Sequence, residues 1–204
     1  MVLERRMNML KNKNIVIGMT GGIACYKVCE LISYFVKEGA NVDVIMTKNA
    51  TQFITPLTIE TLSKRKVVVD MFEKKEHMEV EHISLAKKAD VMLIVPATAN
   101  ILGKVANGIA DDMLSTTIMA TRSKVIFAPA MNDQMYQNLI VQENISKLKN
   151  YGYDFIPPIE GTLACGDFAV GKLAKKESII EAIKNICKGR EAYEVQYYHY
   201  CGRN

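Results

Sequence analysis

Residues 91–100 read VMLIVPATAN, a run of apolar residues that ends in proline, small residues and an amide. The run is short, uncharged and rich in valine and isoleucine, which is typical of a strand buried on both faces of a sheet. Similar runs recur along the chain, and amphipathic stretches separate them. We predict strands at 14–18, 42–46, 91–95, 124–128 and 152–155. Helices are expected at 22–38, 55–64, 82–89, 98–106, 111–121, 138–150 and 176–187.

Strands that alternate with helices form a parallel sheet. The expected fold class is α/β, a Rossmann-like open parallel sheet with helices on both faces, or flavodoxin-like three-layer sandwich. One such domain accounts for a length of 204 residues. We assign 13–187 to this domain, 1–12 to an unstructured lead-in, and 188–204 to a tail whose role the sequence does not indicate. Residues 157–172, which are rich in Gly and Pro without periodicity, are predicted to form a long functional loop.

Composition argues against several classes of protein. The net charge of +4 is small and the lysines are scattered along predicted helices, so nucleic-acid binding is not expected. No apolar run approaches the roughly 18 residues that span a bilayer, and the N-terminus lacks the features of a secretory signal. Five cysteines, an odd number, indicate a reducing cytoplasm rather than a disulfide framework. Cys25 and Cys29 share a helical face without further ligands at matching spacing, which favours core packing over a metal site.

Small or polar residues follow four of the predicted strands, where most residue types would suffice for a crossover. These segments are GMTGGIA at 18–24, MTKNATQF at 46–53, VPATAN at 95–100 and APAMN at 128–132. Ligands of open parallel sheets bind beyond the carboxyl ends of the strands. Each segment also has a simpler interpretation, since Gly21 suits a tight turn and Thr47 or Asn49 suits a helix cap. Together they predict a flat, phosphorylated cofactor, either a nucleotide or a flavin.

Two further residues are candidates for chemistry. His82 begins a predicted helix before the strand at 91–95, where a histidine is more often a cap or a surface residue than a catalyst. Cys165 differs from the helical cysteines because it lies in the irregular loop between Ala164 and Gly166. A loop thiol is also compatible with no function at all.

Four segments carry a family resemblance: GGIACYK at 21–27, EHISLAKKADVMLIVPATANILGKVANGIADDMLS at 81–115, PAMNDQMY at 129–136 and ACGDFAVGKLA at 164–174. In this order and spacing they resemble the phosphopantothenoylcysteine decarboxylases, which belong to the homo-oligomeric flavin-containing cysteine decarboxylases. The resemblance covers roughly residues 13–187. It departs from the family pattern at Tyr136, Leu139, Ala169 and Lys172, where Trp, Pro, Gly and Arg are common. Tyr keeps an aromatic face and Lys keeps the charge without a bidentate fork.

The resemblance implies an FMN enzyme of coenzyme A biosynthesis that converts 4'-phosphopantothenoylcysteine to 4'-phosphopantetheine and carbon dioxide. Direct decarboxylation of an N-acylated cysteine would leave an unstabilised carbanion. Hydride transfer to the flavin first gives a thioaldehyde, which allows the carboxylate to leave with formation of an enethiolate, and the hydride then returns.

The resemblance also assigns roles to residues. His82 is implied as the catalytic base and Cys165 as the acid that protonates the enethiolate. Asn132 is implied to bind the substrate carboxylate, because an amide donates to an anion without adding a charge that opposes its loss as neutral gas. The other substrate-binding residues are Met131, Ala164 and Gly166. The implied FMN-binding residues are Gly21, Thr47, Phe53, Pro96, Ala97, Thr98, Ala99, Asn100, Asp111 and Ala130.

The resemblance also has implications for assembly, for a partner enzyme and for alternative functions. The family assembles as a trimer, or as a dodecamer of trimers, with the flavin between subunits, so one chain is expected to hold an incomplete site. Many relatives continue into a ligase that joins cysteine to phosphopantothenate, and such a ligase is a separate or missing partner here. One alternative is a peptidyl-cysteine decarboxylase that stops at the enethiol, although Cys165 favours the pantetheine pathway. A non-catalytic regulatory flavoprotein is another, although His82 is present, and a flavin prenyltransferase ranks lower because the motifs around His82 and Asn132 differ.

Overall fold

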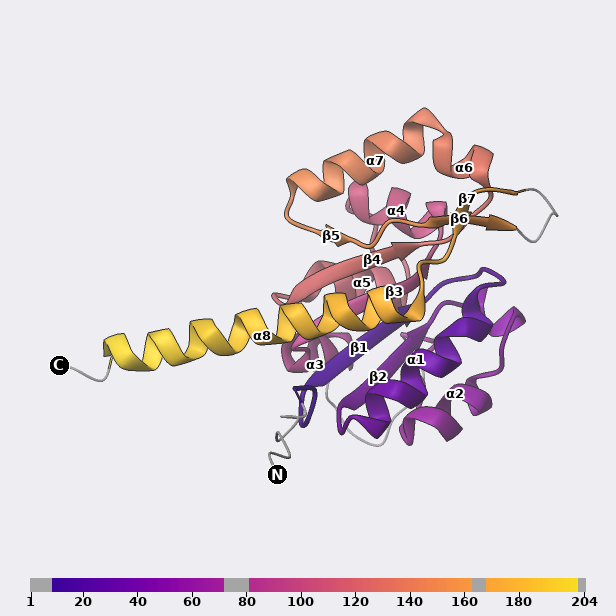
Figure 1. Ribbon diagram of the computed structural model, residues 1–204. Coiled ribbons are helices and arrows are strands. Elements are labelled where there is room, and N and C mark those ends of the chain that lie inside the picture. The colour runs from indigo at the N-terminus through magenta and orange to yellow at the C-terminus, as the bar shows by residue number, and fades with distance from the viewer. Residues whose placement is uncertain (1–8, 72–80, 163–167, 202–204) are drawn as a thin grey trace, which may run out of the picture.

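Buried strands and amphipathic helices alternate along the chain in the computed structural model, which describes residues 9–71, 81–162 and 168–201 (Figure 1). The strands of the main sheet are β1 Asn14–Met19, β2 Asn41–Met46, β3 Val91–Ala97, β4 Lys124–Pro129 and β5 Asp154–Phe155. The helices are α1 Cys25–Lys37, the 3-10 turn η1 Ala50–Gln52, α2 Pro56–Ser63, α3 Glu81–Lys88, α4 Ala99–Ala106, α5 Met113–Ala120, α6 Asp133–Gln137, α7 Leu139–Asn150 and α8 Lys176–Cys201.

The main sheet is five-stranded and parallel, with the order β2-β1-β3-β4-β5. This is the flavodoxin-like strand order, so the predicted fold is confirmed. β1 and β3 are neighbours, yet the chain leaves them toward opposite faces. α1 packs into the core on one face, while α4 packs into the core on the other. When the connections that follow two neighbouring strands pass to opposite faces of the sheet, a crevice forms between them at the carboxyl ends of the strands.

β3 shows why its sequence lacks the alternation of a half-exposed strand. Val91, Leu93 and Val95 belong to the core that α1 and α8 cover, and Met92 and Ile94 belong to the core that α4, α5 and α7 cover. All of β3 is buried. A strand enclosed by helices on both faces has no solvent side, and a continuous apolar run is the result.

One structural prediction was wrong. Residues 157–172 do not form an irregular loop, because β6 Ile159–Thr162 and β7 Phe168–Lys172 pair as an antiparallel hairpin beside α6 (Figure 1). Its frequent glycines masked the alternation of a strand. The helix expected at 176–187 is longer than predicted, since α8 continues to Cys201 and extends beyond the sheet (Figure 1).

The described part of the lead-in also packs against the domain. Leu10 is fully buried in the core, and the amide of Asn12 donates to the carbonyl oxygen of Gly39 at 2.9 Å. Burial of the Leu10 side chain and this hydrogen bond both hold the segment against the domain. Among the described residues, every helix is too short or too polar to cross a bilayer.

Candidate functional site

Two adjoining cavities open where the parallel strands end. The first cavity, of about 590 Å³, is lined by Thr20, Gly21, Met46–Asn49, Val69–Met71, Thr98–Ile101, Lys104, Asp111–Leu114 and Met135. The second cavity, of about 550 Å³, is lined by Gly21–Ala24, Tyr26, Lys27, Thr98, Ala99, Ala130–Asn132, Met135 and Gly171–Leu173. Both volumes fall in the range of roughly 300–1,000 Å³ that is usual for small-molecule sites. The cavities share Gly21, Thr98, Ala99 and Met135, so they lie side by side.

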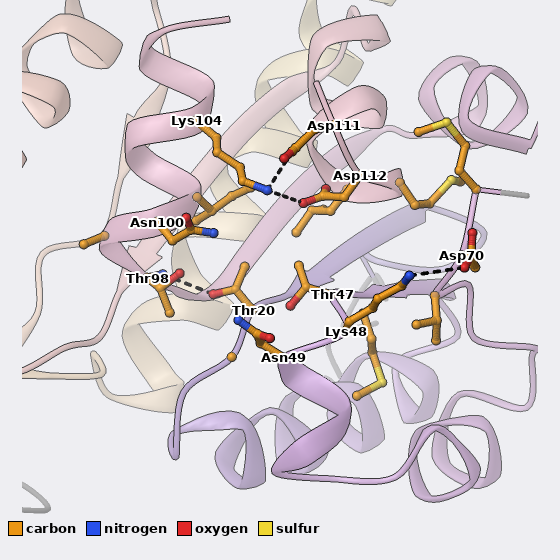
Figure 2. A pocket seen from close by; sticks show the side chains of 18 of the residues that line it. Thr20, Thr47, Lys48, Asn49, Asp70, Thr98, Asn100, Lys104, Asp111 and Asp112 are labelled. Carbon is orange, nitrogen blue, oxygen red and sulfur yellow. Dashed lines mark hydrogen bonds and ion pairs between the residues drawn. The ribbon is translucent and has the colours of Figure 1, made fainter. Parts of the chain in front are cut away.

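Thr20 connects two of the strand ends that form the first cavity. Its hydroxyl donates to the carbonyl oxygen of Pro96 at 2.6 Å. The same hydroxyl accepts from the amide of Thr98 at 3.1 Å (Figure 2). The Thr20 side chain is buried, so both bonds are shielded from water. The loop after β1 is thereby held against the loop after β3, at the position where the two cavities meet.

Gly21 lies against the loop after β2. A Cβ atom at this position would sit 2.4 Å from Cβ of Asn49, which is closer than such contacts occur in proteins. From the sequence, Gly21 suits a tight turn and is implied to bind FMN. The structure adds that glycine is required by the neighbouring loop, because any side chain would separate the two walls of the first cavity.

Thr47 has the capping contact that was its simpler interpretation. Its hydroxyl oxygen accepts from the amide of Ala50 at 3.3 Å at the start of η1. A hydroxyl that accepts this bond keeps its own proton as a donor. Capping and binding of an anion are therefore compatible, and Thr47 does line the first cavity.

Lys104 of α4 binds two carboxylates in the wall of the first cavity (Figure 2). Its Nζ lies 2.6 Å from Oδ1 of Asp111 and 2.9 Å from Oδ2 of Asp112. Burial lowers the pKa of Lys104, but the hydrogen bonds to both carboxylates outweigh it and the net pKa is raised. Burial raises the pKa of Asp112, but the hydrogen bonds from Lys104 and Ser115 outweigh it and the net pKa is lowered. Lys104 and Asp112 therefore stay charged near neutral pH and hold the segment before α5 against α4.

Asn132 lies in the second cavity and caps α6. Its Oδ1 accepts from the amides of Gln134 and Met135 at 3.0 and 3.4 Å. The preceding residue is held by the hairpin, since the amide of Met131 donates to the carbonyl oxygen of Gly171 at 3.0 Å. The opposite end of the amide, Nδ2, is the part of Asn132 that can donate to an anion.

The predicted cofactor residues fall into four groups. Those lining the first cavity are Gly21, Thr47, Thr98, Ala99, Asn100 and Asp111. Ala130 lines the second cavity instead. Pro96 and Ala97 are buried beneath the loop after β3, where the carbonyl oxygens of Pro96 and Ala97 accept hydrogen bonds from Thr20 and Ala130. Phe53 is 49% exposed and lines neither of these cavities, so the structure does not place it with the others.

Of the two predicted catalytic residues, the structure describes His82 alone. His82 is half-buried near the start of α3 and lines neither cavity. Met131 and Asn132 line the second cavity, as expected for substrate-binding residues. Cys165, Ala164 and Gly166 lie outside the described residues.

Several cavity residues were missed from the sequence, among them Lys27, Lys48, Lys104, Asp112 and Met135. Lysines on amphipathic helices looked like ordinary solvated faces. The one sequence pattern that could have indicated a site was the position of Lys104 shortly before the adjacent Asp111 and Asp112.

A model of the flavoprotein family matches residues 3–188. The chain belongs to the flavoprotein family. Among curated relatives, the coenzyme A biosynthesis bifunctional protein CoaBC of Borreliella burgdorferi is 52% identical over 86% of this chain and 45% of its own length. A probable phosphopantothenoylcysteine decarboxylase of Streptococcus mutans is 42% identical over 84% of this chain and 97% of its own. This flavoprotein thus spans about half the length of the bifunctional relatives that it matches.

Solved structures agree with this placement. A PPC decarboxylase mutant complexed with pantothenoylaminoethenethiol is 28% identical, with a TM-score of 0.79, over 87% of this chain and all of its own. The FMN-dependent cysteine decarboxylase SpaF is 30% identical, with a TM-score of 0.77, over 89% of this chain and 98% of its own. The predicted fold and the resemblance noted in the sequence are both confirmed.

Proposed function

We propose that this flavoprotein uses FMN to decarboxylate 4'-phosphopantothenoylcysteine to 4'-phosphopantetheine, in coenzyme A biosynthesis. The observation that carries the proposal is the pair of adjoining cavities. Most predicted cofactor residues line the first, and the predicted carboxylate-binding residue Asn132 lines the second. The relatives named for this pathway and for cysteine decarboxylation support the same reaction.

The residues of the first cavity fit FMN. A flavin ring needs hydrogen-bonding groups along its polar edge, and the start of α4, from the N-cap Thr98 to Asn100, offers main-chain groups and an amide. A phosphate needs donors and positive charge, and Thr47 and Lys48 supply a hydroxyl and an ammonium group on the loop after β2. When bound, FMN would supply the two-electron acceptor that a cysteine needs before it can lose carbon dioxide.

Asn132 is proposed to bind the carboxylate that leaves. Its amide has no net charge, so it can orient a carboxylate without stabilising the anion so strongly that loss as carbon dioxide is opposed. Its oxygen is committed to the start of α6, which fixes the direction of the amide. The Met131–Gly171 bond holds the adjacent backbone in place.

We propose that a second copy of the chain completes the site with His82. This histidine lines neither cavity of its own chain. Beside it, Ile83 is 40% exposed, and Phe53, Ile109 and Met119 are exposed apolar side chains of the kind that an interface covers. A homo-oligomer, with a trimer as the expected form, would bring His82 to the cavity of its neighbour, where its role is to accept a proton from the substrate.

Cys165 is proposed to protonate the decarboxylated substrate. It falls between β6 and β7 in the sequence, outside the described residues. The end of β7 lines the second cavity through Gly171 and Lys172. We place the reaction in the cytoplasm, since neither Cys25 nor Cys29 forms a disulfide bond.

The test is to purify the protein, record its visible spectrum, and follow 4'-phosphopantothenoylcysteine by mass spectrometry. We expect a yellow FMN protein and a saturated product that has lost carbon dioxide. The Cys165→Ser variant should instead accumulate the unsaturated enethiol, and saturated product from it would exclude the assigned role. An enethiol from the wild-type protein would favour a peptidyl-type decarboxylase, and no turnover by a flavin-loaded wild type would favour a regulatory flavoprotein.

A further inference from the structure

Two lysines from distant parts of the chain face the second cavity. Lys27 lies in the first turns of α1, and Lys172 ends β7 in the hairpin. Both line the cavity together with Asn132. Across the side chains that the structure describes, neither lysine forms an ion pair with a carboxylate.

The lysines are held by packing rather than by acids. The Nζ of Lys27 lies 5.8 Å from the centre of the Tyr26 ring. The stem of Lys172 crosses the other strand of the hairpin so closely that a Cβ on Gly161 would lie 2.8 Å from Cδ of Lys172. The absence of a side chain at Gly161 leaves room for this path.

The two lysines line the same cavity, so their like charges oppose each other there. Burial lowers the pKa of Lys27, and the positive charge of Lys172 lowers it further. Two like charges at the wall of one cavity are costly without a counter-ion. An anionic ligand between them removes this cost, so the pair favours binding of a negative charge.

The start of α1 adds to the same field. The amides of Gly22, Ile23 and Ala24 donate to no acceptor among the described residues, and all three residues line the second cavity. Ala24 supplies no side-chain cap, and the first turn of α1 contains no acidic residue. The positive end of the helix is therefore not neutralised from within the chain.

We propose that Lys27 and Lys172 bind the phosphate monoester at the far end of the substrate. This inference rests on the proposed function. It gives the second cavity two kinds of anion-binding group, a neutral amide and a pair of cations. A neutral amide, Asn132, meets the carboxylate that must leave as a neutral gas. Two cations meet the phosphate, which carries about −1.5 to −2 charges near pH 7 and stays on the product. The cofactor phosphate is assigned to Thr47 and Lys48 of the first cavity.

The experiment compares 4'-phosphopantothenoylcysteine with pantothenoylcysteine, which lacks the phosphate. Steady-state kinetics of the FMN-loaded wild type, Lys27→Gln and Lys172→Gln are measured with both substrates. We expect each variant to raise KM for the phosphorylated substrate about tenfold or more, as expected for loss of a charge-assisted contact. KM for pantothenoylcysteine and the FMN content should not change. Lys27→Arg should recover most of the loss, because it keeps the charge.

Lys37→Gln is the matched control, since Lys37 is exposed at the opposite end of α1 and the substitution removes the same charge. Equal effects of Lys27→Gln or Lys172→Gln on both substrates would overturn the proposal, as would an effect of similar size from Lys37→Gln. Loss of FMN from the variants would assign the lysines to the cofactor phosphate and would also overturn it. A wild type that is loaded with FMN but decarboxylates neither substrate would refute the proposed function, and this inference with it.

Discussion

The amide of Met131 donates a hydrogen bond to the carbonyl oxygen of Gly171, with nitrogen and oxygen 3.0 Å apart. This bond joins the segment after β4 to the end of the β6–β7 hairpin. A Cβ on Gly171 would lie 2.2 Å from the carbonyl oxygen of Met131, so the contact tolerates no side chain. Asn132 and Lys172, which follow these two residues, are thereby held on the same cavity.

Gly171→Ala should separate the hairpin from the segment that carries Asn132. The added methyl group forces a backbone shift, and we expect a loss of about 1–3 kcal/mol in the free energy of unfolding, typical of overpacking. kcat/KM should fall while FMN stays bound. Gly103→Ala in α4 is the control, because its Cβ would come no closer than 3.8 Å to Asn144 Nδ2. Thermal unfolding and kinetics measure both effects, and unchanged kinetics in Gly171→Ala would contradict the account.

Gly21→Ala should weaken FMN binding, whereas Gly22→Ala should not. The new Cβ at Gly21 would lie 2.4 Å from Asn49, while a Cβ at Gly22 would make only ordinary contacts at 3.9 Å with Pro96 and Thr98. The first substitution therefore pushes apart two walls of the first cavity. Flavin content after purification and titration of the apoprotein with FMN measure the difference. Equal affinities of the two variants would count against placing the cofactor in this cavity.

Asn132→Asp should separate the capping role of this residue from its role toward substrate. Aspartate is as good an N-cap as asparagine, so α6 and the melting temperature should be little changed. The substituted carboxylate has no donor at neutral pH and repels the substrate carboxylate, so kcat/KM should fall about hundredfold or more. Asn132→Ala should lose both stability and activity. Full activity of Asn132→Asp would show that capping is the only role of this side chain.

Asp112→Asn should change how stability depends on pH. The pKa of Asp112 is lowered in the folded chain, so its contribution is present above its unfolded pKa of about 3.9 and is lost as pH falls through the folded value. Asparagine still caps α5 but cannot pair with Lys104 as a charge. We expect lower stability at pH 7. The melting temperature should also fall less steeply than that of the wild type as the pH is lowered. Asp154→Asn, in a more exposed pair with Lys124 at 3.7 Å, should change this profile much less.

Mixed oligomers test whether two copies share one site. His82→Asn alone should keep FMN and lose at least about a hundredfold in turnover, as expected for a missing general base. Co-expression of His82→Asn with Asn132→Asp should restore activity, because about a quarter of randomly assembled interfaces would combine an intact His82 with an intact Asn132. Mixtures no more active than either variant alone would place both residues in one chain's site.

The sequence predicted the main sheet well, because the apolar pattern of a buried strand can be recognised within the strand itself. Strands buried on both faces, such as Val91–Ala97, must be apolar throughout, and this pattern is visible without neighbours. Parallel strands also end at one edge, which explains why the sequence pattern alone correctly groups Thr47, Thr98 and Asn132 where the cavities open. The hairpin was missed because its glycines obscure the alternation of β6 and β7.

What the sequence determined by itself was the alternation of strands and helices and the edge of the sheet at which polar residues gather. The tertiary structure alone decided which of these residues meet. Lys104 pairs with Asp111 and Asp112, and Gly21 fits against Asn49. Lys27 and Lys172, from distant parts of the chain, line one cavity. Such contacts depend on loop paths and side-chain directions that only the closed fold defines, and a pattern read along one chain does not contain them.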